Sequence, residues 1–124
     1  MKNNEARIQQ SIVIWFRNNY CLKTSIPKCT IFSVPNERNS KKEMMFMKAT
    51  GLLSGVSDLI CVIPNKVLFI ECKDDKGRQQ PNQIEFEKTV TALGFKYYLV
   101  RSLDDFKSIP EIKPLINHIN RSSQ

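Results

Sequence analysis

Apolar residues near the start of the chain recur at the spacing of an amphipathic helix. This spacing predicts a helix over residues 4–19. Its apolar face consists of Ile8, Ile12, Trp15 and Phe16. Glu5 stands three residues before Ile8 and extends this face by one turn. Glu5 is therefore either a solvated first-turn acid that interacts favourably with the helix dipole, or an acid directed inward at a site.

The centre of the chain contains two nearly continuous apolar runs. Residues 56–63 and 67–73 each predict a strand, and Pro64-Asn65-Lys66 between them predicts the turn of a hairpin. Because both runs are apolar at almost every position, we expect the sheet to be covered on both faces.

Shorter segments on either side complete the pattern. Residues 29–34 predict a strand, and residues 40–50 predict a short helix whose methionines we expect to fill the core. Residues 81–93 predict a helix with proline in its first turn, and residues 95–100 predict a strand. A weakly amphipathic segment over residues 111–119 follows. The resulting order is helix, strand, short helix, strand, strand, helix, strand, helix.

Charged residues at the ends of the two central runs indicate chemistry. An acid on one strand, with an acid and a lysine two residues apart on the next, can hold a divalent cation and an ammonium group beside a phosphodiester. Asp58 on the first run, with Glu71 and Lys73 on the second, fits this description. Charges also follow apolar runs where a strand emerges into solvent. The geometry of the hairpin therefore decides between a metal site and a solvated strand end.

Strand periodicity sets a condition on this site. Glu71 and Lys73 are two residues apart and share a face, and opposed residues of an antiparallel pair share a face as well. Asp58 lies opposite Glu71 if Ile63 pairs with Lys66, and opposite Lys73 if the loop is two residues longer. A loop with an odd number of residues would move Asp58 to the other face. The site therefore requires an even loop or a compensating bulge.

One polar residue stands among apolar ones in the helix over residues 81–93. Gln83 shares a face with Phe86, Val90 and Leu93. A polar side chain on such a face needs a hydrogen-bonding partner. Gln83 is either an amide bonded to a strand end or a residue that organises the site.

Composition and charge narrow the class of protein. The chain has 124 residues, 41% of them apolar and 25% charged, which is typical of a single globular domain. A net charge of +7 favours polyanionic partners through phosphate contacts, although charge alone does not establish nucleic-acid binding.

Location and cysteine usage follow from the same sequence. No apolar run approaches the ~20 residues that a membrane span needs, and the polar N-terminus leads into an amphipathic segment rather than a secretory signal. We therefore expect no membrane association and a cytoplasmic location, in a bacterial or phage-infected cell. The four cysteines have no CxxC spacing, which favours buried reduced thiols over a zinc site or disulfides.

Several short motifs follow one another in order along the chain. They are Val34-Pro35-Asn36-Glu37, Lys48, Gly51, Gly55-Val56-Ser57-Asp58-Leu59, Leu68-Phe69-Ile70-Glu71-Cys72-Lys73, Gly77-Arg78, Gln83 and Gly94-Phe95. This ordered set resembles the VRR-NUC family, in its stand-alone phage and bacterial form, within the PD-(D/E)xK or restriction-endonuclease-like superfamily. The resemblance covers about residues 5–106 of an expected single domain over residues 1–124, with residues 107–124 as a C-terminal helical extension. Ser57 departs from the family, which usually has proline at this position.

The resemblance implies a fold and a metal site. The fold is α/β, with a restriction-endonuclease-like αβββαβ core in which helices flank a central mixed sheet. Asp58, Glu71 and the backbone carbonyl of Cys72 would bind Mg²⁺ or Mn²⁺, which prefer hard oxygen ligands. Glu5 matches a first-helix acid of the family that joins the metal shell, often through water.

The resemblance also implies roles in catalysis. Asp58 and Glu71 would act through the metal, which polarises a phosphate oxygen and places the attacking water. Lys73 would position that water or neutralise the charge of the transition state. Gln83 would orient Lys73 or the water from the neighbouring helix.

The substrate expected from the resemblance is DNA, because family members of this size resemble the phage and archaeal Holliday junction resolvases. We therefore expect a metal-dependent, structure-selective DNA endonuclease that acts as a homodimer on four-way junctions. The alternatives are a flap or general nuclease of the same family, an enzyme that cuts RNA, and a catalytically idle DNA-binding module. Exposed apolar residues of the first helix or of the C-terminal segment are candidates for the dimer surface.

Overall fold

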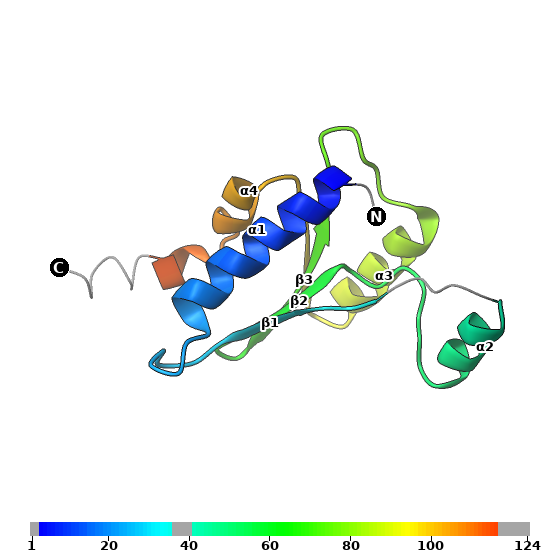
Figure 1. Ribbon diagram of the computed structural model, residues 1–124, viewed down its shortest axis with the longest axis horizontal. Helices are drawn as coiled ribbons and strands as arrows, with labels where there is room; N and C mark the ends of the chain where they lie inside the picture. The colour runs from blue at the N-terminus through cyan, green and yellow to red at the C-terminus, as the bar shows by residue number, and fades with distance from the viewer. Residues whose placement is uncertain (1–2, 36–40, 117–124) are drawn as a thin grey trace.

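A computed structural model describes residues 3–35 and 41–116 of the chain. The described elements are α1 (Asn3–Tyr20), β1 (Thr30–Ser33), α2 (Lys41–Ala49), β2 (Leu59–Ile63), β3 (Lys66–Cys72), α3 (Pro81–Ala92), β4 (Lys96–Val100) and α4 (Leu103–Lys107). The order of helices and strands is the one that the hydrophobic pattern predicts, although α4 lies before the predicted helical segment of residues 111–119. Figure 1 shows α1 lying lengthwise along the sheet, with α4 beside it.

The sheet is mixed, as the resemblance implies. Its four strands lie in the order β1-β2-β3-β4. The first three strands pair antiparallel, and β4 pairs parallel with β3. The parallel pair requires a crossover connection, and α3 provides it. Helices flank this sheet, so the fold is α/β.

The hairpin of β2 and β3 has the even loop that the predicted site requires. Ile63 pairs with Lys66, so the loop consists of two residues, Pro64 and Asn65. Asn65 has a φ of 62°, a left-handed conformation that asparagine tolerates better than most residues. The same register continues to the pair Leu59–Ile70. One step further, Asp58 stands opposite Glu71.

One face of the sheet carries the main hydrophobic core. Its strand residues alternate along each strand, as the period of two demands, and α1, α4 and the segment after α4 cover them. The largest members are Phe16, Phe106, Ile12, Ile31, Leu59, Leu68, Ile70 and Ile112. Phe16 and Phe106 meet edge to face with their ring centroids 5.9 Å apart, which joins α1 to α4.

The opposite face of the sheet is covered by α3 over β3 and β4, and its part on β2 is only half-buried. Phe69 meets Phe86 of α3 with ring centroids 5.3 Å apart. Ile60 and Val62, on the same face, stay partly exposed. Full cover on both faces was predicted, and the second face falls short of it because α3 contacts β4 rather than lying over β2. Asp58 and Glu71 lie at the end of this less crowded face.

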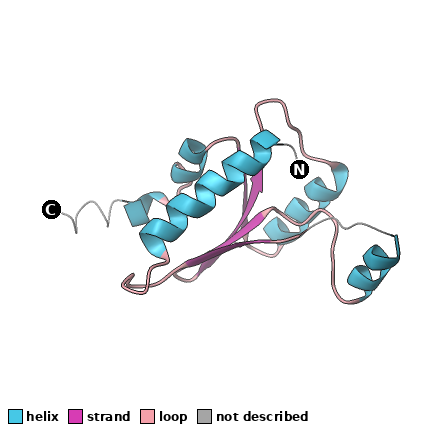
Figure 2. Cartoon of the chain, viewed as in Figure 1, coloured by secondary structure: helices cyan, strands magenta, loops and turns pink. Residues whose placement is uncertain are grey.

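The expectation for the methionines of α2 is wrong. Met45 and its neighbour Phe46 are 72% and 69% exposed, and Met44 and Met47 are half-buried outside the core. Figures 1 and 2 show the reason: α2 stands on an arm beyond the end of the sheet rather than against it. The spacing of apolar residues correctly identifies an apolar side of this helix, but it does not show whether that side packs against the sheet.

The segment after α4 belongs to the folded body. Ile109 and Ile112 are buried in the core, and residues 113–116 are helical. The predicted amphipathic segment extends to Ile119, which lies outside the described residues. The four cysteines are free thiols, and Cys29, Cys61 and Cys72 are buried, as expected. No helix in the described ranges is both long and apolar enough to cross a membrane.

Candidate active site

The hairpin brings Asp58 and Glu71 together at the end of the sheet. The backbone N–H of Cys72 donates to Oδ2 of Asp58 over 2.7 Å, which fixes this carboxylate against β3. Ser57 is fully buried, and its hydroxyl donates to the carbonyl oxygen of Leu59 over 3.1 Å. This short-range bond restrains the backbone directly before Asp58. Ser57 stands where the family that the chain resembles usually has proline, a residue that also restrains the backbone.

Glu71 lies in a hydrogen-bonded network, although its side chain is almost completely buried. Nε2 of Gln83 donates to Oε2 of Glu71 over 2.8 Å, and Nζ of Lys73 lies 3.6 Å from the same oxygen. The Gln83 side chain also accepts from the Gln80 backbone N–H over 2.8 Å. The two interpretations of Gln83 are therefore compatible. Its amide bonds the end of β3, and the residue that it bonds there, Glu71, belongs to the predicted site.

Two further residues support Glu71 and were not foreseen. The hydroxyl of Tyr97 lies 3.4 Å from Oε1 of Glu71, with hydrogen-bonding geometry. Nε2 of Gln79 donates to the Tyr97 hydroxyl over 3.2 Å and to Oε1 of Glu87 over 2.8 Å. Burial and the nearby Glu71 charge raise the pKa of Tyr97, so its hydroxyl stays protonated and able to donate.

A close approach of two backbones places α3 beside the hairpin. Gly55 has a φ of +88°, and a Cβ atom at this position would lie 2.3 Å from the carbonyl oxygen of Asn82. Only glycine allows this contact, because it has no Cβ and accepts a positive φ. Asn82 lies in the first turn of α3, directly before Gln83. The glycine therefore lets α3 start close enough for Gln83 to reach Glu71.

Glu5 reaches the same site from α1. A cleft of about 690 Å³ is lined by all the side chains predicted for the site, namely Glu5, Asp58, Glu71, Lys73 and Gln83. A Cβ atom at Gly77 would lie 3.0 Å from Oε1 of Glu5 and 3.2 Å from Cδ of Lys73. The reading of Glu5 as an acid directed at a site therefore agrees with its position.

Burial and mutual repulsion raise the pKa of both central carboxyl groups. For Glu71 the pKa rises to about 8, first because burial disfavours the charged form and then because the charge of Asp58 is close. The pKa of Asp58 is raised chiefly by burial, against the opposing effect of the Cys72 amide, and Glu5 adds to the increase. Simultaneous ionisation of both carboxyl groups is therefore opposed in the metal-free cleft, and a divalent cation bound between them would favour their charged forms.

The donor set fits Mg²⁺ or Mn²⁺. Asp58 and Glu71 offer carboxylate oxygens, and Cys72 can contribute only its backbone carbonyl because its thiol is buried in the core. Among the residues that the structure describes, no three His, Cys, Asp or Glu side chains form a closed metal-binding cluster. Such a cluster is not required, since Mg²⁺ is usually held by one or two carboxylates and retains several waters.

Comparison with known proteins agrees with this architecture. The sequence model of the VRR-NUC domain matches residues 3–104. A solved VRR-NUC domain protein superposes with a TM-score of 0.69 and 21% identity, covering 94% of this chain and 91% of that one. A second solved VRR-NUC domain gives a TM-score of 0.57 at 18% identity and covers 94% and 98% of the two chains. A search of curated proteins gave no match.

Proposed function

This chain belongs to the VRR-NUC family, and we propose that it is a metal-dependent, structure-selective DNA endonuclease that hydrolyses phosphodiester bonds. The family implies a nuclease-type function. The observation that carries the rest of the proposal is the convergence of Asp58, Glu71 and Lys73 in one cleft. An idle binding module would have no use for two buried carboxylates whose ionisation is opposed by burial.

Each predicted site residue has a role in this proposal. Asp58, Glu71 and the carbonyl of Cys72 would hold Mg²⁺ or Mn²⁺, which supplies Lewis-acid chemistry at a phosphate oxygen when bound. The ammonium group of Lys73 would neutralise the negative charge that develops as water attacks phosphorus and the P–O bond to the leaving oxygen breaks. Gln83 orients Glu71 through its 2.8 Å hydrogen bond, and Glu5 would contact the metal through water.

The substrate we propose is a four-way DNA junction, cut by a homodimer. The net charge of +7 favours a large phosphate surface. A junction is resolved by two matched cuts, so two copies related by a twofold axis would place one cleft on each of two strands. Flaps, linear duplexes, single strands and RNA remain alternative substrates of the same chemistry.

A substrate panel tests the function. Labelled four-way junction, flap, duplex, single-stranded DNA and RNA are each incubated with the protein and Mg²⁺ or Mn²⁺, beside the Glu71→Ala variant. We expect symmetric cuts in the junction that need the metal and disappear in the variant. Preferential cutting of another substrate would replace the resolvase assignment with that of a flap or general nuclease. Absence of cleavage in every arm, with salt-sensitive DNA binding retained, would leave an idle DNA-binding module.

The arm formed by α2 offers a surface for the second copy. Met45 and Phe46 are largely exposed, and Leu53 on the return segment is 58% exposed. A helix of nine residues gains little stability on its own in water, so burial of this apolar side against a partner would stabilise it. Two large apolar side chains of α2 are exposed, whereas on the described part of α1 Ile14 is the one large apolar side chain that is, at 52%.

The mass of the protein in solution tests this dimer surface. We expect a dimer by light scattering after size exclusion, and a monomer for the double variant Met45→Ser/Phe46→Ser. Leu93→Ser is the matched control, because Leu93 is an equally exposed apolar residue at the end of α3, and it should stay dimeric. A monomeric wild-type protein would exclude the homodimer, and a dimeric double variant would exclude the arm as its interface.

A further inference from the structure

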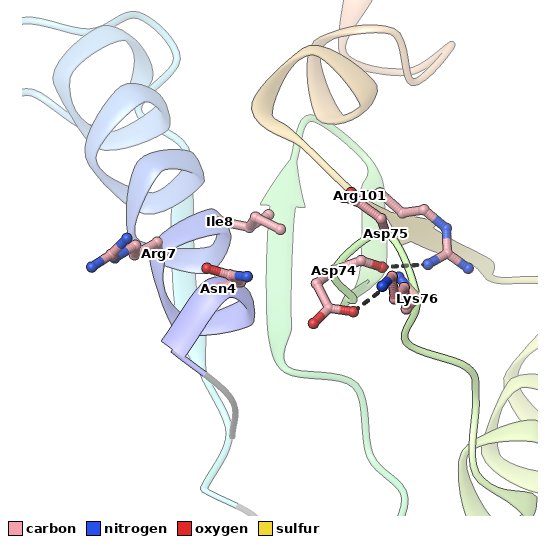
Figure 3. Close-up of a pocket in the computed structure, with 7 residues that line it drawn as sticks. All are labelled: Asn4, Arg7, Ile8, Asp74, Asp75, Lys76 and Arg101. Atoms are coloured by element: carbon pink, nitrogen blue, oxygen red, sulfur yellow. Dashed lines mark hydrogen bonds between the residues drawn. The ribbon is translucent and has the colours of Figure 1, made fainter.

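The loop that follows β3 forms a tight turn directly after Lys73. Oδ1 of Asp74 accepts from the backbone N–H of Lys76 over 3.1 Å and from that of Gly77 over 2.7 Å. The Gly77 N–H also lies 3.2 Å from the carbonyl oxygen of Asp74. Figure 3 shows this loop across an open cavity from the first turn of α1. The cavity has a volume of about 500 Å³.

Arg101 joins the two ends of this turn. Its Nη1 donates to the carbonyl oxygen of Gly77 over 2.9 Å and to that of Asp74, the second bond being drawn in Figure 3. The backbone of Arg101 is itself fixed, because its N–H donates over 2.9 Å to the carboxylate of Asp105 in the first turn of α4. One guanidinium group therefore ties the loop after β3 to the end of β4.

The loop held in this way packs against two residues that line the active-site cleft, Glu5 and Lys73. The space that a Cβ atom would need at Gly77 is occupied by Oε1 of Glu5 at 3.0 Å and by Cδ of Lys73 at 3.2 Å. If the loop moved away, the stem of Lys73 and the carboxylate of Glu5 would both lose Gly77 as a neighbour. The position of two site residues thus depends on a loop that Arg101 restrains.

We propose that Arg101 is a positioning residue for the nuclease reaction: it holds the turn of residues 74–77 so that Gly77 packs on Lys73 and Glu5. This role rests on the function proposed above. A basic residue near such a cleft would ordinarily be assigned to DNA phosphate. Here the Nη1 protons are directed at two carbonyl oxygens, and Figure 3 shows Arg7, the nearest arginine of α1, pointing away from Arg101.

The first test measures the loop without any activity. In Arg101→Met, hydrogen exchange at the Gly77 amide should be at least tenfold faster than in the wild type, while exchange at the Leu68 amide in β3 stays unchanged. The side-chain NMR signals of Lys73 should shift in the same variant, because its stem loses a packing partner. Unchanged exchange at Gly77 would overturn the proposal whether or not the protein cuts DNA.

The second test separates positioning from DNA binding. We expect Arg101→Met to reduce kcat at least tenfold with KM for the DNA substrate within threefold, and Arg101→Lys to recover part of that loss. Lys23→Met, which removes an exposed charge from the loop between α1 and β1, should change neither constant. A rise in KM alone would identify Arg101 as a phosphate contact, and an unchanged kcat despite faster loop exchange would also overturn the positioning role. If the wild type cuts no substrate, the proposed function fails, and the exchange measurement still decides the loop contact.

Discussion

Replacing Lys73 by methionine is expected to reduce the rate of DNA cleavage by about 10²- to 10³-fold, the usual effect of removing one group that stabilises transition-state charge. Nζ of Lys73 lies 3.6 Å from Glu71 inside a cleft with two buried carboxylates, so no bulk solvent replaces its charge. Methionine keeps an unbranched stem that can pack against Gly77. The loss should therefore reflect the missing ammonium group rather than a collapsed loop.

Single-turnover cleavage of a labelled junction measures this effect, and fluorescence anisotropy without divalent metal measures binding. We expect the binding constant of Lys73→Met to stay within about threefold of the wild-type value, since one buried charge contributes little to the long-range field. Lys76→Met is the matched control, because Lys76 is an exposed lysine three residues further along the chain. Cleavage by Lys73→Met within a few-fold of the wild-type rate would remove Lys73 from the reaction.

The central hairpin shows how far local sequence rules reach. A period of two, a two-residue loop and an antiparallel pair are local properties, so they place Asp58 opposite Glu71 once Ile63 pairs with Lys66. The family resemblance then adds Glu5 and Gln83, which lie on two helices outside the hairpin. The structure brings all of them into one cleft.

Contacts that depend on the parallel pair could not be predicted in this way. Tyr97 faces Glu71 because Phe69 pairs with Tyr97 in the register of β3 and β4. That register is set by packing of the crossover helix rather than by a short turn. Arg101 reaches the loop of residues 74–77 for the same reason, since it follows β4 directly. A sequence gives no local signal for either contact.

The prediction that the methionines of α2 fill the core was wrong for a related reason. The pattern of Met45 and Phe46 identifies an apolar helical side, and the same pattern is produced by a core helix and by a helix that packs on another chain. What distinguishes the two is the location of the helix relative to the sheet, which the spacing of apolar residues does not specify. Sequence periodicity alone therefore could not separate a core helix from one whose apolar side chains are exposed.

Replacing Asp58 by asparagine is expected to stabilise the metal-free protein while abolishing cleavage. Burial opposes the ionised form of Asp58, and the Asp58 charge in turn raises the pKa of Glu71. Asparagine removes that charge, and its carbonyl oxygen can still accept from the Cys72 amide at the position of Oδ2. We expect a gain of about 1 kcal/mol in the free energy of unfolding, or about 4 °C in Tm, for a domain of this size.

Thermal unfolding with and without Mn²⁺ measures both consequences. At a hundredfold excess over its Kd, the metal should stabilise the wild type by about 2.7 kcal/mol through mass action, and should leave Asp58→Asn unchanged. Asp75→Asn is the matched control, because Asp75 is an exposed acid in the loop after β3, and it should respond to Mn²⁺ as the wild type does. A metal-free Asp58→Asn protein with a lower Tm than the wild type would show that the carboxylate is held for structure. An equal response of Asp58→Asn and wild type to Mn²⁺ would place the metal elsewhere.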